Sequence, residues 1–159
     1  MEFQLNSGTF DSTLDEKGRV VIPAFLRDKY SEKIVVTQGV ENCVWVLTIP
    51  TFENLLKKFK KESKERNLSS EEIEAFYYQH ESPARLVEID PKTGRIPIPV
   101  NLRNYAQLTK DCLVVSIKNH LEIWNTELNK AFMDEVRLLN KGIHKKMLGQ
   151  VNFFSEDDE

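Results

Sequence analysis

The sequence predicts an α+β fold in which two similar β-rich halves share one core and helices separate and follow them. Two observations lead to this prediction. The stretch LDEKGRVVIPAFLR at residues 14–27 returns as IDPKTGRIPIPVNLR at residues 89–103. Between and after these copies, apolar residues recur every three or four positions, which is typical of amphipathic helices. A chain of 159 residues is long enough for one domain or for two small halves with a common core.

The similarity between the halves extends beyond the motif. At one constant offset, the sequence pairs Gly18 with Gly94, Arg19 with Arg95, Ile22 with Ile98, Pro23 with Pro99, Leu26 with Leu102 and Arg27 with Arg103. Further along, IVVT at 34–37 resembles LVVS at 113–116, and VWVL at 44–47 stands where LEIW stands at 121–124. A unit of roughly 45 residues is too small for a substantial core of its own. Two packed copies would bury what neither buries alone.

Each half is predicted to be a strand, a turn, a second strand, a short helix and a hairpin. The strands before the motif span residues 8–14 and 84–89, and the turns are DEKGR and DPKTGR. Asp and Gly supply the side-chain cap and the positive φ that tight turns need. The runs VVI and IPI are strands by their β-branched content. The closing hairpins turn at QGVEN in the first half and at IKNH in the second.

The prolines of the motif have separate predicted roles. Pro23 and Pro99 suit the first position of a short helix, where no N–H is required. Pro97 lies inside a strand and lacks a ladder donor, so that strand is expected to be an edge or to bulge. In the short helices, one face is expected to carry Phe25, Leu26 and Tyr30 in the first half and Leu102, Tyr105 and Leu108 in the second.

Three longer helices are expected outside the repeats. The first begins at Pro50 and Thr51, with Phe52, Leu55, Leu56 and Phe59 on one side. The second begins with a capping box formed by Ser69 and Glu72. The third begins after Asn125 or Thr126 and carries an apolar stripe that is either core or a subunit contact, made of Leu128, Phe132, Val136, Leu139, Ile143 and Met147.

Composition excludes several classes of protein. No apolar run approaches the roughly 20 residues that span a bilayer, and the N-terminus resembles no signal peptide, which predicts a cytoplasmic protein. Cys43 and Cys112 share no CxxC spacing and are expected to be reduced and partly buried, and the three histidines lie far apart, so no metal site is predicted. The net charge is −3, but the last four residues carry −4, so the remainder carries +1. A local basic face is therefore compatible with the acidic total.

The candidate site residues lie in the two turns. Lys17, Arg19, Lys92 and Arg95 are basic, and charged residues are common in surface turns. If the halves pack by pseudo-twofold symmetry, however, both turns form one basic surface. Arginine offers a planar fork that fits phosphate oxygens or the O6/N7 edge of guanine, and lysine offers a point charge for the backbone.

Four further residues are expected to support these turns. Asp15 and Asp90 would cap the turns and hold the guanidinium groups, while Gly18 and Gly94 supply the positive φ. A catalytic pair of carboxylates is the weaker alternative, because no nucleophile, metal cluster or phosphate-binding glycine loop accompanies them.

Two other basic features have structural interpretations. Arg27 and Arg103 follow the short helices, where a cation at the C-terminus is favourable. The segment 57–66 carries six positive and two negative charges and is interpreted as a solvated helix face, with phosphate contact as the alternative.

These motifs resemble a known family. GTFDSTLDEKGRVVIPAFLR at 8–27 resembles the first repeat of the MraZ family of bacterial transcriptional regulators, ARLVEIDPKTGRIPIPVNLRNYAQL at 84–108 resembles its second repeat, and LEIWN at 121–125 resembles its closing strand. The resemblance implies two tandem AbrB-like swapped-hairpin units that interleave into a pseudo-twofold β-rich barrel flanked by helices. It also implies a ring-shaped homo-oligomer that binds double-stranded DNA at short G-rich repeats upstream of the division and cell-wall gene cluster, usually as a repressor.

In the family, the arginine of the DxxxR motif faces DNA. The resemblance implies the same role for Arg19, which follows Asp15, and for Arg95, which follows Asp90. The second turn departs from that spacing, because DPKTGR is one residue longer. The extra residue allows the turn to bulge and to aim Arg95 differently. The resemblance further implies a nucleoid-associated protein with no enzymatic activity, no cofactor, no small-molecule substrate and no membrane partner.

The expected organisation is a first repeat at 7–54, a helical connector at 55–82, a second repeat at 83–126, a C-terminal helix at 127–148 and an acidic tail at 149–159. Two other functions remain open. An AbrB-like antitoxin would use the long helices to cover a toxin, although such antitoxins usually carry one copy and dimerise. A β-rich interaction scaffold would present its basic turns to an acidic protein. A phosphate-ester hydrolase is disfavoured by the missing metal and nucleophile sets.

Overall fold

A computed structural model describes residues 5–156, so the last three residues of the predicted acidic tail lie outside the described part. The chain divides into a first unit, residues 1–126, and a second unit, residues 127–159. The first unit contains, in chain order, β1 (Gly8–Thr13), β2 (Arg19–Val21), the 3-10 helix η1 (Ala24–Leu26), β3 (Ile34–Gln38), β4 (Val44–Thr48), α1 (Ile49–Glu65), α2 (Ser70–His80), β5 (Arg85–Val87), β6 (Arg95–Pro97), α3 (Val100–Tyr105), β7 (Asp111–Ile117) and β8 (His120–Asn125). Helix α4 (Thr126–Met147) follows.

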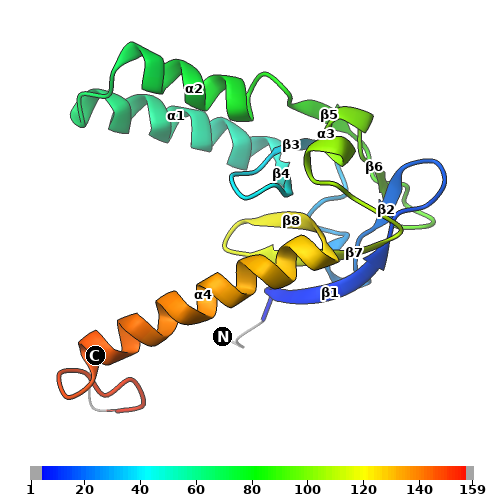
Figure 1. The fold of residues 1–159 in the computed structure, drawn as a ribbon. Coiled ribbons are helices and arrows are strands. Elements are labelled where there is room, and N and C mark those ends of the chain that lie inside the picture. The colour runs from blue at the N-terminus through cyan, green and yellow to red at the C-terminus, as the bar shows by residue number, and fades with distance from the viewer. Residues whose placement is uncertain (1–4, 157–159) are drawn as a thin grey trace. The chain divides into compact units, whose positions relative to one another are not determined.

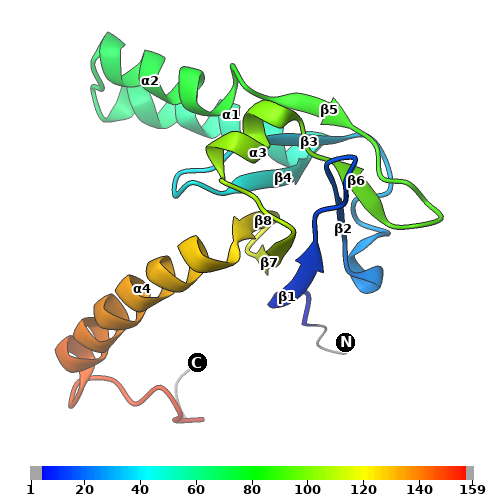
Figure 2. The same cartoon turned by 45° about the vertical axis from the view of Figure 1, so that its right-hand side comes forward.

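The main sheet interleaves the two repeats. Its six strands run in the order β1-β7-β8-β4-β3-β5, and every pairing is antiparallel. The first strand of each repeat therefore pairs with the hairpin of the other repeat: β1 adds to β7, and β5 adds to β3 (Figures 1 and 2). Read outward from the central β4–β8 pair, the order is the same in both directions. This confirms the predicted α+β class and the exchange of strands between halves.

A second, two-stranded sheet joins the motif strands. β2 pairs antiparallel with β6, with Val20 opposite Ile96. The pair is extended symmetrically, because Ile22 N–H donates to the carbonyl of Gly94 at 2.8 Å and Ile98 N–H donates to the carbonyl of Gly18 at 2.9 Å. Both strands are edges, so the missing N–H of Pro97 breaks no second ladder, as predicted. The strand pairings of the described residues form two separate sheets and do not show the expected closed barrel.

One core serves both repeats. Equivalent motif residues are buried in each half, and the cluster includes Val20 and Ile96, Ile22 and Ile98, and Leu26 and Leu102, together with Val36 and Val46 of the first hairpin and Val114 and Ile123 of the second. Because these side chains belong to one contiguous cluster, neither half keeps its core without the other.

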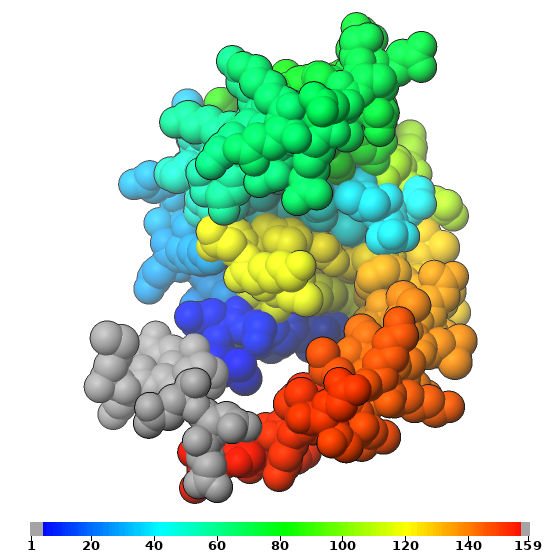
Figure 3. All heavy atoms as spheres, turned by 90° about the vertical axis from the view of Figure 1, so that its left-hand side faces the viewer, coloured from blue at the N-terminus to red at the C-terminus, as the bar shows by residue number. Residues whose placement is uncertain are grey.

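The predicted helix pair between the repeats is confirmed. Thr48 caps α1, and Ser69 and Glu72 form the expected capping box at the start of α2. Phe59 of α1 stacks on Phe76 of α2 with ring centroids 3.7 Å apart. Figure 3 shows this helix pair, in cyan-green to green, at one end of the first unit beside the yellow β7–β8 hairpin.

The short helices correct two expectations. Pro23 and Pro99 occupy the N-cap and not the first helical position, because their ψ values of 140° and 147° are extended. In the first repeat only Leu26 and Tyr30 point inward, whereas Phe25 is 52% exposed and meets the edge of Phe10. The 3-10 helix is three residues long, and at three residues per turn neighbouring positions point in different directions.

Helix α4 begins at Thr126, within the predicted range. Along its predicted apolar stripe, Leu128, Phe132 and Val136 are partly buried, but Leu139 is 71% exposed and Ile143 is 52% exposed. Leu138, next to the stripe, is 71% exposed as well. The last three turns of α4 therefore present an apolar surface to solvent.

Candidate nucleic-acid interface

The first motif turn is organised by one carboxylate. Asp15 Oδ1 accepts the backbone N–H groups of Lys17 at 3.0 Å and Arg19 at 2.8 Å. The Asp15 carbonyl accepts the N–H of Gly18, whose φ of +78° is one that L side chains rarely adopt. This aspartate and this glycine therefore shape the first turn.

The same carboxylate contacts both motif arginines. Asp15 Oδ2 accepts Nε of Arg19 at 2.9 Å and lies 3.5 Å from Nε of Arg95. The hydrogen bond from the Arg19 backbone N–H is the main cause that lowers the pKa of Asp15, with the Arg19 guanidinium adding to it. Both contacts use Nε, so the terminal nitrogens of each guanidinium are not used in holding the arginine to Asp15.

The second turn, which is one residue longer than the first, holds its arginine differently. Asp90 Oδ1 accepts the backbone N–H of Lys92 at 2.9 Å, which is the main cause that lowers the pKa of Asp90. Gly94 has a φ of +71° and donates its N–H to the Asp90 carbonyl. Among the described residues, the ion pair of Arg95 is with Asp15 and not with Asp90. The longer turn thus places Arg95 beside the first repeat's carboxylate.

The two turns form one surface, which we call the twin-turn surface: Asp15, Lys17, Arg19, Lys92 and Arg95. The side chains of Arg19 and Arg95 are 31% and 34% exposed, so the guanidinium groups are held but accessible. Lys17 and Lys92 are exposed. Figures 1 and 2 show both turns beside the β2–β6 pair. Two arginines held on one carboxylate, with an exposed lysine in each turn, can bind a polyanion.

Arg27 and Arg103 lie where the sequence did not predict them. A Cβ placed on Gly18 would be 2.7 Å from Cζ of Arg103, and a Cβ placed on Gly94 would overlap with the guanidinium of Arg27. Each arginine therefore packs against the turn glycine of the opposite repeat. The sequence did show that each Leu-Arg pair and each turn glycine recur at the same offset. It did not show that the arginine of one repeat contacts the glycine of the other.

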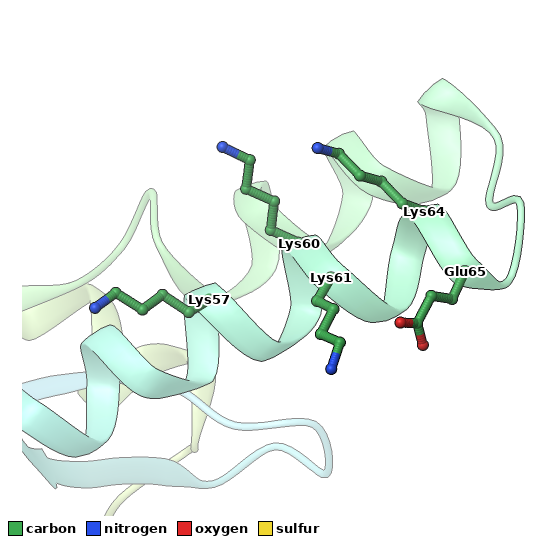
Figure 4. Close-up of a pocket in the computed structure, with 5 residues that line it drawn as sticks. All are labelled: Lys57, Lys60, Lys61, Lys64 and Glu65. Atoms are coloured by element: carbon green, nitrogen blue, oxygen red, sulfur yellow. The ribbon is translucent and has the colours of Figure 1, made fainter.

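The basic segment of α1 has the solvated character expected of it. Lys57, Lys60, Lys61 and Lys64 are all exposed. Figure 4 shows their amino groups extending away from the helix, with Lys61 pointing to a different side from Lys60 and Lys64. No carboxylate in the described part of the chain holds them as Asp15 holds Arg19, so this face lacks the preorganisation of the twin-turn surface.

Residues 5–156 contain no metal-binding cluster, no paired cysteines and no membrane-spanning helix. No cluster of three or more His, Cys, Asp and Glu side chains suitable for a metal ion occurs there. Cys43 and Cys112 are buried and unpaired, and burial raises the pKa of Cys112 to about 11. None of the helices in the described part combines the length and apolarity required to traverse a bilayer.

Comparison with known proteins decides the family. A family model described as "MraZ protein, putative antitoxin-like" matches residues 5–71 and again residues 82–148. The chain belongs to the MraZ family. The double match contains both motif turns, so each copy of the sequence repeat is an MraZ repeat. This agrees with the family resemblance of the two motifs.

A curated relative covers nearly the same length. The chain is 36% identical over 140 residues to a protein of Symbiobacterium thermophilum named transcriptional regulator MraZ, and the alignment covers 88% of this chain and 98% of that protein. The relative's name describes a regulator and not an enzyme, in agreement with the prediction of a non-enzymatic MraZ protein.

Replacing Asp15 with asparagine should reduce stability at neutral pH in a pH-dependent way. Folding lowers the pKa of Asp15, so its contribution is fully present above the unfolded-state pKa of about 3.9 and is lost as the pH falls through the folded-state pKa. The Tm difference between the parent protein and Asp15→Asn should therefore shrink as the pH is lowered from 7 toward 2. Thermal unfolding followed by circular dichroism measures it.

The matched control is Asp134→Asn. Asp134 forms an exposed i,i+3 pair with Arg137 at 3.4 Å, and such pairs contribute little. Its Tm should equal that of the parent protein throughout. A Tm difference for Asp15→Asn that stays constant down to pH 2 would show that the carboxylate charge does not stabilise the turn.

Proposed function

We propose that this MraZ protein is a sequence-specific transcriptional regulator that binds double-stranded DNA through the twin-turn surface. The observation that supports this most is the position of Asp15 between Arg19 and Arg95. One carboxylate fixes two guanidinium groups on one surface through Nε. A side chain fixed before binding loses less conformational entropy on binding.

The chemistry of the surface suits G-rich DNA. Arginine pairs with the O6 and N7 acceptors of guanine in the major groove, and lysine contacts phosphates. We assign base contacts to Arg19 and Arg95 and phosphate contacts to Lys17 and Lys92, with the repeats at 7–54 and 83–126 supplying one turn each. The target is a set of short G-rich repeats upstream of the division and cell-wall genes, and the expected effect is repression in a cytoplasmic, nucleoid-associated protein.

Assembly into a ring would make this binding strong. The exposed residues at the end of α4, Leu139, Ile143 and Met147, are suited to contact a second copy. A single protomer of net charge −3 offers few DNA contacts. Protomers linked in one ring engage successive DNA repeats at a high effective concentration, so affinity can exceed that of one protomer by roughly 100-fold or more.

Mobility-shift titrations with DNA that carries one, two or four G-rich repeats test the proposal. Affinity should rise steeply with repeat number and fall with salt, since each phosphate contact releases counterions. A scrambled duplex of equal length and composition is the control. Equal affinity for all duplexes would contradict both sequence-specific recognition and the multivalent ring.

The family description favours a second candidate, an antitoxin-like role. In that case the exposed apolar end of α4 would cover a toxin instead of a second copy. Size-exclusion chromatography with light scattering on the purified chain separates the two. A ring formed by the chain alone supports the regulator, whereas a monomer that does not retain G-rich DNA supports the antitoxin.

A further inference from the structure

The two Leu-Arg arginines cross between the repeats. Arg27 follows the short helix of the first repeat, yet its guanidinium packs against Gly94 in the turn of the second repeat. Arg103 does the reverse and packs against Gly18 in the turn of the first. Both glycines are buried. The exchange is reciprocal, so it is a property of the twofold arrangement and not of one loop.

A hydrogen bond places Arg27 at the junction between the motif strands. Arg27 Nε donates to the carbonyl of Ile22 at 3.0 Å, and the N–H of Ile22 donates to the carbonyl of Gly94 at 2.8 Å. In the other half, the N–H of Ile98 donates to the carbonyl of Gly18 at 2.9 Å. Arg103 Nε is buried and has no hydrogen-bond partner in the described part of the chain, and its guanidinium packs against Gly18.

We propose that Arg27 and Arg103 are positioning residues for DNA binding that act across the repeats: Arg27 holds the turn that carries Arg95, and Arg103 holds the turn that carries Arg19. This inference rests on the proposed function. It departs from the sequence-based interpretation, in which each arginine only stabilises the C-terminus of its own helix.

The physical reason is the shape of the guanidinium group. It is planar and occupies the space beside the turn glycine that a Cβ would need, which a lysine ammonium on a flexible stem does not reproduce. The arginine therefore limits the movement of the turn behind the DNA-contacting residue. Glycine is required at 18 and 94 for two reasons, the positive φ and the space that the arginine fills.

Hydrogen exchange without DNA tests the crossed assignment directly. Arg27→Lys keeps the charge but loses the guanidinium contact, so the amide of Gly94 should exchange faster while the amide of Gly18 is unchanged. Arg103→Lys should give the opposite pattern. Faster exchange at the glycine of the same repeat, or equal changes at both glycines, would overturn the proposal. If a lysine variant fails to fold, Arg27→Gln or Arg103→Gln, which also removes the guanidinium but leaves the turn glycines in place, replaces it.

Double-mutant cycles that measure DNA affinity test whether Arg27 and Arg103 act on DNA binding. Arg27→Lys should weaken binding of G-rich DNA by roughly 2- to 100-fold in the parent protein but add nothing to Arg95→Ala, because both remove the same contact. When Arg27→Lys is combined with Arg19→Ala, the fold-losses of DNA affinity from the two variants should multiply. Full multiplication with both variants, or coupling to Arg19 instead, would overturn the positioning role. If Arg19→Ala and Arg95→Ala both bind DNA normally, the proposed function fails, while the exchange experiment still decides which turn each arginine holds.

Discussion

Arg19→Ala should lower the affinity for G-rich DNA by about 30-fold to 10⁴-fold while leaving the fold and the oligomer unchanged. A bidentate arginine–guanine contact is worth roughly 1–3 kcal/mol, and every engaged protomer of a ring loses it, so two protomers lose about 2–6 kcal/mol. The side chain of Arg19 is 31% exposed and stands at the first position of β2, next to the turn, so its removal costs little core packing. Mobility shift measures the affinity, and size-exclusion chromatography measures the assembly.

Two variants serve as controls for Arg19→Ala. Arg66→Ala removes an arginine from α1 that is 74% exposed and paired with Glu62, so DNA affinity should stay within about twofold. Arg19→Lys keeps the charge without the planar fork and should fall between Arg19→Ala and the parent protein. Undiminished binding by a folded, assembled Arg19→Ala protein would move the DNA-binding surface elsewhere, with the basic face of α1 as the next candidate.

Leu102→Ala should destabilise the whole first unit by roughly 2–5 kcal/mol, the range for buried leucines. Leu102 is 0% exposed and belongs to the core that both repeats share. For a chain of this size the loss corresponds to a Tm about 5–15 °C lower. Leu26→Ala, at the equivalent buried position of the first repeat, should lower the same transition. Thermal unfolding at fixed protein concentration measures both, since assembly makes Tm depend on concentration.

Val100→Ala is the matched control for the core variants. Val100 lies on the same short helix as Leu102 but is 60% exposed, so its replacement should change stability by less than about 0.5 kcal/mol. Two separate transitions, with Leu26→Ala affecting one and Leu102→Ala the other, would contradict a core built from both repeats.

Much of the fold follows from the duplicated motif. Positions with the same offset, such as Ile22 and Ile98, are buried together because the halves are related by a pseudo-twofold arrangement. Local rules also placed the turns and the capping box of Ser69, since these depend on residues only a few positions apart. The sequence also predicted, from pseudo-twofold packing, that the two turns form one surface, and the structure pairs the strands that follow them, β2 with β6.

Contacts between residues of different repeats could not be predicted from the sequence. The extra residue of the second turn suggested that Arg95 is aimed differently, but its partner, Asp15, lies in the other repeat. The crossed contacts of Arg27 and Arg103 depend likewise on the interleaved topology. The exposure of Phe25 was missed for a local reason, because a short 3-10 helix does not keep the face of an α-helix.

Site-specific photo-crosslinking to a G-rich duplex tests the central claim, that both turns bind DNA as one surface. A photoreactive residue is placed in turn at position 17, at position 92 and, as the control, at position 64 on the basic face of α1. The account predicts crosslinks to DNA from positions 17 and 92 in the same complex and only background from position 64. Crosslinks from position 64 alone, or from only one of the two turns, would contradict it.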